Sequence, residues 1–371
     1  MSDTPLPDVL TYLSHLPQQA GSDMFFSVGA PPHLKVEGHS RPVGERVLGN
    51  GEVKTLAWQL MTPEQAGEFE RDLEMNLAVS VPDVGRFRAN IYYQRGEVAM
   101  VVRLIKQVIP DVTALGLPPI LDKLAMQDRG LILVIGAAGS GKSTTLASML
   151  DFRNRHRSGH IVCIEDPIEF LHAHHKSIID QREVGLDTRS FEDALRNVLR
   201  EAPDVIMLGE IRDAATMQHA LHYAETGHLC VATLHGTSCR HAIERIARFF
   251  PDEARAQVLA DLSQNLLALV GQRLVPGVRQ RRVVAVELVL GTPHIRGLIQ
   301  RDELPELKGA VERALESGMQ SFDQSLYRLL EEGRITLADA LKFADSRTDL
   351  ALKVKLERGM DDDGGGSLFG A

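Results

Sequence analysis

The chain has few of the residues that cross-link small or secreted proteins. Its 371 residues include only three cysteines, Cys163, Cys230 and Cys239, which lie far apart and form no CxxC pair. The sequence therefore excludes a disulfide framework and a zinc site built from thiolates. Its length is ample for a core without such staples, and it predicts two or three domains.

Basic charge, aromatic side chains and long apolar runs are also scarce. Lys and Arg total 41 against 50 Asp and Glu, for a net charge of −9, and aromatic residues make up 5% with one tryptophan, Trp58. Nucleic-acid binding calls for a basic face and often for stacking aromatics. No apolar run approaches the ~20 residues of a spanning helix, and no signal-peptide pattern opens the chain. We expect a soluble cytoplasmic protein that binds no nucleic acid and inserts no segment directly into a membrane.

Residues 1–105 have the pattern of a small α+β domain. An amphipathic helix is expected over Leu6–Leu16, and Thr62-Pro63-Glu64-Gln65 is a capping box that starts a second helix. Five short strands are expected, the first two as a hairpin: Phe25–Val28, Leu34–Val36, Leu77–Val81, Arg86–Tyr93 and Val98–Ile105. A proline-stiffened linker over residues 106–119 follows.

Beyond the linker the pattern changes to apolar runs that alternate with helical segments. The runs are Leu131–Ile135, Ile161–Ile164, Val205–Leu208 and Leu229–Leu234. Such runs indicate strands buried on both faces, so we predict an α/β domain with a parallel sheet over residues 120–290. Helices alone are expected over 291–347, with capped starts at Ser321–Gln324 and Thr336–Asp339. The tail over 348–371 ends in an acidic, glycine-rich stretch that we expect to be disordered.

A phosphate-binding loop follows the first buried run. Its residues are Gly136, Ala137, Ala138, Gly139, Ser140, Gly141, Lys142, Ser143 and Thr144. The motif lies between a predicted strand and a predicted helix, which is the context that its chemistry requires. Backbone N–H groups and the helix N-terminus would face the phosphates of ATP. Lys142 would reach the β and γ phosphates, and Ser143 would ligate Mg²⁺.

Acidic residues follow two later strands, at the sheet edge where ligands bind in open α/β folds. Glu165, Asp166 and Glu169 come after Ile161–Ile164, and Glu210 comes after Val205–Leu208. A carboxylate there can polarise an attacking water or hold Mg²⁺ through water. The alternative is a solvated loop acid, and for Glu165 and Asp166 the two interpretations are equally supported.

Histidines and arginines complete the set of candidates. His228 and His235 bracket the run Leu229–Leu234, and this separation argues against a shared metal. Either histidine can be a hydrogen-bonded structural residue or a phosphate sensor. The tract over residues 172–175 is interpreted as a surface loop, and the arginine-rich stretches at 153–157 and 279–282 as solvated faces or contacts to a membrane platform protein. Three arginines on predicted strands of the first domain are solvated charges by themselves but arginine fingers if a nucleotide lies near: Arg88, Arg95 and Arg103.

Taken together, these motifs resemble those of one family. The order Gly-Ser-Gly-Lys-Ser-Thr-Thr, Ile-Glu-Asp-Pro-Ile-Glu-Phe, Leu-Gly-Glu-Ile-Arg-Asp and Glu-Thr-Gly-His-Leu…Thr-Leu-His is similar to that of secretion-type ATPases. Within them the chain resembles the type IV pilus retraction ATPases of the PilT/PilU family over about residues 20–345. That resemblance implies a homo-hexameric ring in which each chain has a PAS-like N-terminal domain and a RecA-like ATPase domain, with ATP between them.

The resemblance also implies a role for each matching residue. Glu169 becomes the catalytic glutamate, Glu210 the Walker B acid that holds Mg²⁺ through water, and His228 with His235 a histidine pair. Arg88, Arg95 and Arg103 become phosphate-contacting arginines, although the loop at Gln94-Arg95 is one residue shorter than in typical PilT. The implied partners are a PilT-like ATPase and an inner-membrane pilus platform protein, at the inner face of the cytoplasmic membrane.

Departures from the PilT pattern favour the PilU branch, an accessory retraction ATPase that powers twitching motility. A helix motif linked to retraction in PilT is matched by His294–Arg301, with Gly297 in place of asparagine. The stretch Ser321–Tyr327 and the tail beyond Arg347 are also more PilU-like. Alternatives remain: a PilT-type primary motor, an assembly ATPase of pili or of type II secretion, a non-catalytic ring subunit that supports a partner motor, and a nucleic-acid motor. The assembly ATPases usually carry a four-cysteine zinc module that three scattered cysteines cannot supply.

Overall fold

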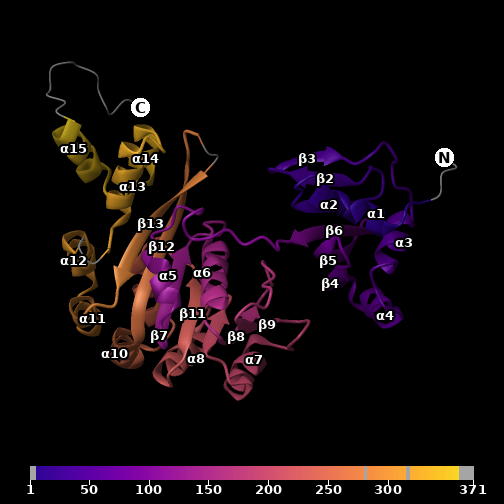
Figure 1. Cartoon of the computed structure of the whole chain (residues 1–371). Helices are drawn as coiled ribbons and strands as arrows, with labels where there is room; N and C mark the ends of the chain where they lie inside the picture. The colour runs from indigo at the N-terminus through magenta and orange to yellow at the C-terminus, as the bar shows by residue number, and fades with distance from the viewer. Residues whose placement is uncertain (1–5, 280–281, 315–317, 359–371) are drawn as a thin grey trace. The chain divides into compact units, whose positions relative to one another are not determined.

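The chain folds into two compact units. The computed structural model describes residues 6–279, 282–314 and 318–358. Unit 1 comprises Met1–Val108 with Ile168–Leu171, and unit 2 comprises Ile109–Pro167 with His172–Ala371 (Figure 1). The short segment Ile168–Leu171 is thus part of unit 1, although the chain on both sides of it belongs to unit 2. Among the helices of the described residues, none combines the length and the apolarity that crossing a membrane requires.

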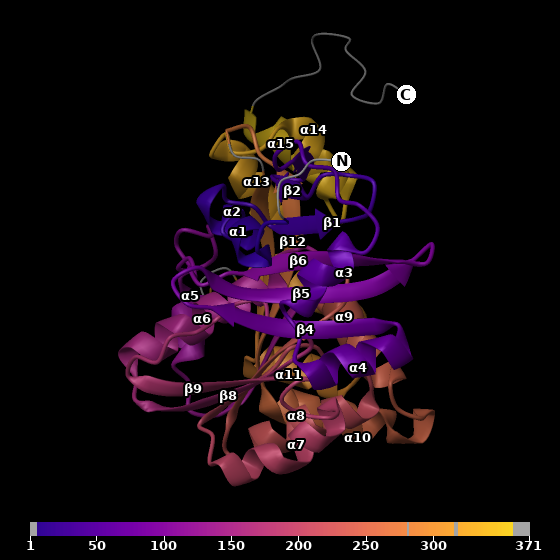
Figure 2. The ribbon, with the colours of Figure 1, turned by 90° about the vertical axis from the view of Figure 1, so that its right-hand side faces the viewer.

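Unit 1 is built on an antiparallel sheet of six strands in the order β3-β2-β1-β6-β5-β4. The strands are β1 (Asp23–Phe26), β2 (His33–Val36), β3 (His39–Pro42), β4 (Glu74–Val81), β5 (Gly85–Gln94) and β6 (Glu97–Ile105). The helices are α1 (Val9–Leu13), α2 (His15–Gln18), α3 (Glu52–Trp58) and α4 (Pro63–Asp72). Figure 2 shows β4, β5 and β6 side by side, as the sequence predicted.

Alternation along β5 separates a buried face of this sheet from an open one. Phe87, Ala89 and Ile91 are fully buried in one cluster with residues of the four helices. The side chains between them, such as Asn90, face the other side. The predicted capping box of α4 is confirmed. The predicted helix over Leu6–Leu16 is instead two short helices, because Pro17 has no N–H to donate to the carbonyl four residues earlier.

Unit 2 contains a seven-stranded sheet in the order β13-β12-β7-β11-β10-β8-β9. The strands are β7 (Gly130–Gly136), β8 (Gly159–Glu165), β9 (Ser177–Glu183), β10 (Val205–Leu208), β11 (Leu229–Leu234), β12 (Leu266–Pro276) and β13 (Arg282–Leu290). All neighbours pair in parallel except β12 and β13, which form an antiparallel hairpin. The four predicted buried strands are confirmed, and the predicted α/β fold class with them.

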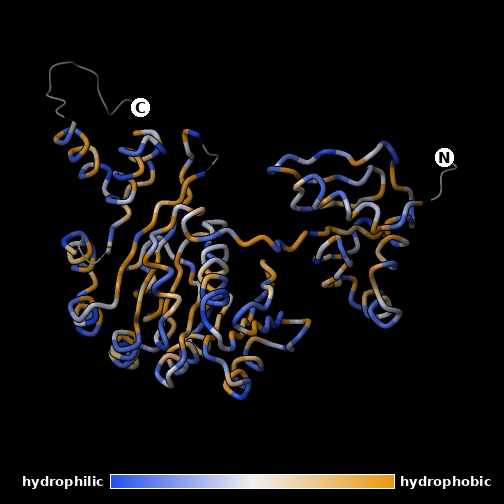
Figure 3. The backbone as a smooth tube through the Cα atoms, in the orientation of Figure 1, coloured by the Kyte–Doolittle hydropathy of each residue, from blue (hydrophilic) through white to orange (hydrophobic). Residues whose placement is uncertain are grey.

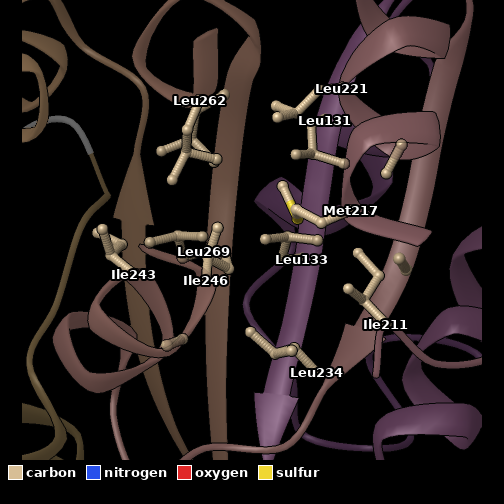
Figure 4. Packing of buried hydrophobic residues seen from close by; sticks show 14 of the residues in the cluster. Leu131, Leu133, Ile211, Met217, Leu221, Leu234, Ile243, Ile246, Leu262 and Leu269 are labelled. Carbon is tan, nitrogen blue, oxygen red and sulfur yellow. The ribbon is translucent and has the colours of Figure 1, made fainter. Parts of the chain in front are cut away.

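Helices cover both faces of this sheet. They are α5 (Ile120–Ala125), α6 (Lys142–His156), α7 (Phe191–Val198), α8 (Ala214–Glu225), α9 (Cys239–Arg248), α10 (Arg255–Asn265), α11 (Pro293–Gln300) and α12 (Leu307–Arg313), with 3₁₀ turns η1 (Leu199–Glu201), η2 (Asp252–Ala254) and η3 (Leu304–Glu306). Leu131 and Leu133 of β7 pack toward Met217 of α8 (Figure 4), whereas Ile132 and Val134 join the opposite cluster under α5 and α6. The strands are correspondingly apolar in Figure 3.

The last helices form a separate cluster on the far part of the β12–β13 hairpin. They are α13 (Phe322–Glu331), α14 (Leu337–Phe343) and α15 (Arg347–Arg358). The capped starts of α13 at Ser321 and of α14 at Thr336 are confirmed. The acidic end of the tail lies outside the described residues.

One predicted surface feature is wrong. Arg153 of the stretch 153–157 is not a solvated charge: it is buried, and its guanidinium donates to the carbonyls of Ala125 and Gln127. Burial lowers the pKa of this arginine. The side chain thus ties α6 to the end of α5.

Candidate active site

The phosphate-binding loop connects β7 to α6. Gly136 ends the strand, and a Cβ there would overlap Ser140 and lie 2.8 Å from the backbone oxygen of Gln272. Gly141 adopts φ +92° at the N-cap of α6 and brings no side chain to the helix terminus. By contrast, α7, α8 and α9 each begin with a side-chain cap, from Ser190, Asp213 and Ser238. The first N–H groups of α6 are therefore left for an anion.

Lys142 lies inside this loop. Its ammonium group donates to the backbone oxygens of Gly136 at 3.1 Å and Ala137 at 3.0 Å, and it lies 3.5 Å from Nδ1 of His235. His235 follows β11, which is the strand next to β7 in the sheet. The structure therefore brings His235 to the P-loop lysine.

Glu210 joins the same group from the end of β10. Its Oε1 lies 3.2 Å from Nε2 of His235, so His235 stands between Glu210 and Lys142. With its proton on Nε2, the imidazole donates to Glu210 and its Nδ1 accepts from Lys142. Three of the predicted site residues thus form one chain of polar contacts at the carboxyl edge of the sheet.

Arg212 is a site residue that the sequence analysis did not single out. Its Nε donates to Oε2 of Glu210 and its Nη1 to Oδ2 of Asp166, each at 3.1 Å. The bond to Glu210 is the main reason that the pKa of Arg212 is raised. Arg212 belongs to the Leu-Gly-Glu-Ile-Arg-Asp motif, and its position two residues after Glu210 was the available signal. Asp166 is therefore paired, and Glu165 is buried with Oε1 accepting from Gln181 at 2.9 Å.

The oxygen donors at this edge fit Mg²⁺ bound together with a nucleotide. Ser143 is the second residue of α6, and its hydroxyl and the Glu210 carboxylate are hard donors. Within the described ranges, no group of three or more His, Cys, Asp or Glu could by itself hold a metal ion. Mg²⁺ commonly keeps water and substrate phosphates as ligands and needs few protein groups.

The predicted catalytic Glu169 lies in unit 1. The segment Ile168–Leu171 is attached there by Lys106, which forms a parallel bridge with Phe170 and whose oxygen accepts from the N–H of Leu171 at 3.0 Å. Glu169 itself is exposed. The carboxylate thus belongs to the same unit as the three candidate arginines.

Two of those arginines face each other across β5 and β6. Arg88 is the register partner of Arg103, so both lie on the same side of the sheet. Arg103 donates from Nε to Oδ1 of Asp23 at 2.7 Å. Arg95 does not lie on a strand as expected: with Gly96 it forms the turn between β5 and β6, at φ +51° and +80°. Two positive φ angles in a two-residue hairpin turn are typical of type I′.

His228 lies away from the other site residues of unit 2. It precedes β11, whereas His235 follows it, so the strand separates them by roughly 20 Å. Nδ1 of His228 lies 3.1 Å from Oγ1 of Thr226 and 3.2 Å from the oxygen of Tyr223. The structure therefore places His228 at the opposite edge of the sheet from Lys142.

Comparisons with known proteins point to one family. A family model described as type II/IV secretion system protein matches residues 71–351. The Pseudomonas aeruginosa type IV pilus ATPase PilU is 49% identical over 348 residues, which cover 93% of this chain and 91% of that protein. The type IV pilus retraction ATPase PilT of the same organism is 40% identical over 333 residues, covering 90% and 97%.

Among solved structures, the pilus retraction motor PilT with bound ADP is similar at a TM-score of 0.88. It is 40% identical, and the match covers 93% of this chain and 99% of the other. The likeness extends over both units of the present chain.

Proposed function

The chain belongs to the type II/IV secretion system protein family, and we propose that it is a PilU-type ATPase that powers the retraction of type IV pili. The observation that carries the enzymatic part is the cluster of Lys142, His235 and Glu210 at the uncapped start of α6. The full-length match to PilU carries the pilus part. The higher identity to PilU than to PilT favours the accessory type over the primary motor.

In this proposal each group of residues has its own role in ATP hydrolysis. The N–H groups at the start of α6 and the Lys142 ammonium bind the phosphates and hold the γ-phosphate in line for attack. Ser143 and Glu210 would hold Mg²⁺, which neutralises charge on the phosphate oxygens. Glu169 orients and deprotonates the attacking water, and Arg88, Arg95 and Arg103 stabilise the negative charge of the transition state. His235 reports the state of the phosphate to Glu210, with which it is in contact.

The assembly that we propose is a ring of six chains. It would lie in the cytoplasm at the inner face of the membrane, together with a PilT-like ATPase and a pilus platform protein. ATP binding and release would change the geometry within the ring, and movement rather than chemistry would be the useful output. We retain in this proposal the domain boundaries at residues 105, 119, 290 and 347, and the role of His228 as the second member of the histidine pair.

The enzymatic proposal is tested by replacing Glu169 with glutamine. Glu169→Gln keeps the size of the side chain but removes the base, so it should bind a fluorescent ATP analogue as the wild type does and lose hydrolysis by at least about 100-fold. Glu303→Gln is the matched control, because Glu303 is an exposed acid that is paired with Arg301 at the end of α11 and is not one of the candidate site residues. Full hydrolysis by Glu169→Gln would remove that residue from its role.

The pilus assignment is tested in cells. We expect the wild-type gene to restore twitching to Pseudomonas aeruginosa that lacks PilU, and the Lys142→Ala gene to fail. Restoration of a strain that lacks PilT instead would identify a primary motor. Failure in both strains, with the protein present and active as an ATPase, would contradict a role in retraction.

A further inference from the structure

The loop that carries His235 is held from outside the active site. Residues 235–238 connect β11 to α9. At Gly236 the backbone passes so close to β7 that a Cβ would lie 2.9 Å from Ile135. The position of His235 beside Lys142 therefore depends on how the two ends of this short loop are fixed.

Arg273 of β12 bonds this loop and the C-terminal helices at the same time. Its Nη2 donates to the oxygen of Thr237 at 2.8 Å and to Oδ1 of Asp345 at 2.6 Å, and its Nη1 donates to the oxygen of Phe343 at 2.8 Å. The guanidinium also lies 3.8 Å from the ring centre of Phe322, the first residue of α13. One side chain thus connects the His235 loop to α13 and to the junction of α14 and α15.

Glu287 fixes the other end of the loop. Its Oε2 accepts from the N–H of Cys239, the first residue of α9, at 2.7 Å. The Glu287 residue is 7% exposed, and this burial raises the pKa of its carboxyl group. Gly271, its register partner on β12, leaves the space: a Cβ there would lie 3.1 Å from that carboxylate oxygen. The β12–β13 hairpin therefore contacts both the loop and the helix that follows it.

The segment between α14 and α15 that Arg273 contacts is also bonded to α13. The N–H groups of Asp345 and Ser346 donate to the Asp323 carboxylate at 2.7 and 3.2 Å. Asp323 is itself buried in α13 and accepts from Lys308 at 2.7 Å. The segment that Arg273 contacts is therefore hydrogen-bonded to α13, so a displacement of Arg273 would act on connected helices.

We propose that Arg273, with Glu287, is a positioning residue that holds His235 in the nucleotide site and transmits its state to helices α13–α15. The proposal rests on the proposed ATPase function and names the path by which that site acts on the C-terminal helices. Arginine is required because its planar guanidinium reaches three acceptors at once, the backbone oxygens of Thr237 and Phe343 and the Asp345 carboxylate. Lysine has a single terminal nitrogen.

The test uses the full chain with ADP as the probe. Arg273→Ala should bind ADP as the wild type does, and its kcat for ATP should fall on the order of 10–100-fold, with KM changed less than about threefold. Hydrogen exchange of peptides covering 337–346 should slow on ADP binding in the wild type and should not respond in the variant. Arg255→Ala is the control, because Arg255 makes a comparable two-bond ion pair with Asp302 but has no bond to the loop or to α13–α15 among the contacts described.

A second variant keeps the proposal testable if Arg273→Ala does not fold. Asp345→Asn removes the ion pair but leaves the bond to Thr237, so it should keep most of the turnover and weaken the exchange response. Wild-type turnover in Arg273→Ala, or an exchange response that persists there, would overturn the inference. Hydrogen exchange over 337–346 that does not slow when the wild type binds ADP would also overturn the inference. A wild type that binds no ADP would overturn the proposed function as well.

Discussion

His172 makes the stability of unit 2 sensitive to acid. Its ring Nδ1 is buried without a hydrogen-bond partner in the described part of the chain, and its backbone N–H donates to Gln181 at 3.0 Å. Burial lowers the pKa of His172 from 6.5 to about 4, although the Asp151 carboxylate opposes the shift. The prediction of a surface loop for this tract is therefore incomplete, since His172 is its half-buried member.

The direction of the pH effect on stability follows from the protonation of His172 in the unfolded and the native protein. In the unfolded chain the ring takes up a proton near pH 6.5, while in the native protein it stays neutral to about pH 4. The stabilisation is complete above pH 6.5 and is lost as the pH falls toward 4. A pKa difference of about 2.5 corresponds to at most about 3.4 kcal/mol, of which about 2 kcal/mol is lost by pH 5.

The assay is urea unfolding followed by circular dichroism at pH 8 and pH 5. We predict that the wild type loses about 2 kcal/mol more between these values than His172→Gln, which cannot titrate. His175→Gln, in the same loop but exposed, should behave as the wild type. Equal losses in the wild type and in His172→Gln would refute the reasoning.

Two further predictions concern the site and the core. Glu210→Gln should lower ATP turnover by about 10–100-fold with nucleotide binding retained, because Glu210 contacts His235 and, in the proposed mechanism, would hold Mg²⁺ through water. An unchanged kcat would remove Glu210 from that role. Leu133→Ala should lower the free energy of unfolding by about 2–5 kcal/mol, since Leu133 is fully buried in β7. Ile178→Ala should change it by less than about 0.5 kcal/mol in urea titrations, because the Ile178 side chain on β9 is exposed.

The part of the fold that the sequence predicts is the part with uninterrupted apolar runs. Leu131–Ile135 alternates between two cores, so every residue is buried and the strand is evident. The sequence does not predict the β12–β13 hairpin, because Gly271, Gln272 and Arg273 interrupt the apolar run of β12 and Glu287 interrupts that of β13. The sequence does not predict β9 either, because Ile178 is exposed and polar residues follow Ile179, so the strand has no apolar run and no regular alternation.

The candidate site also has a part that the sequence predicts and a part that it does not. The P-loop, Glu210 and His235 come at strand ends, and parallel topology brings strand ends together. The contacts of Arg212 and Arg273 depend on side-chain reach to other elements, which spacing along the chain does not encode. The opposite placement of His228 was predictable, because a fully extended strand separates it from His235.

The central claim is tested most directly by steady-state ATP hydrolysis of the purified chain beside Lys142→Ala, with native mass measured in the same buffer. The account predicts turnover that vanishes in Lys142→Ala, in a particle of six chains. Equal turnover in both proteins, or none in a wild type supplied with a PilT ring, would contradict it.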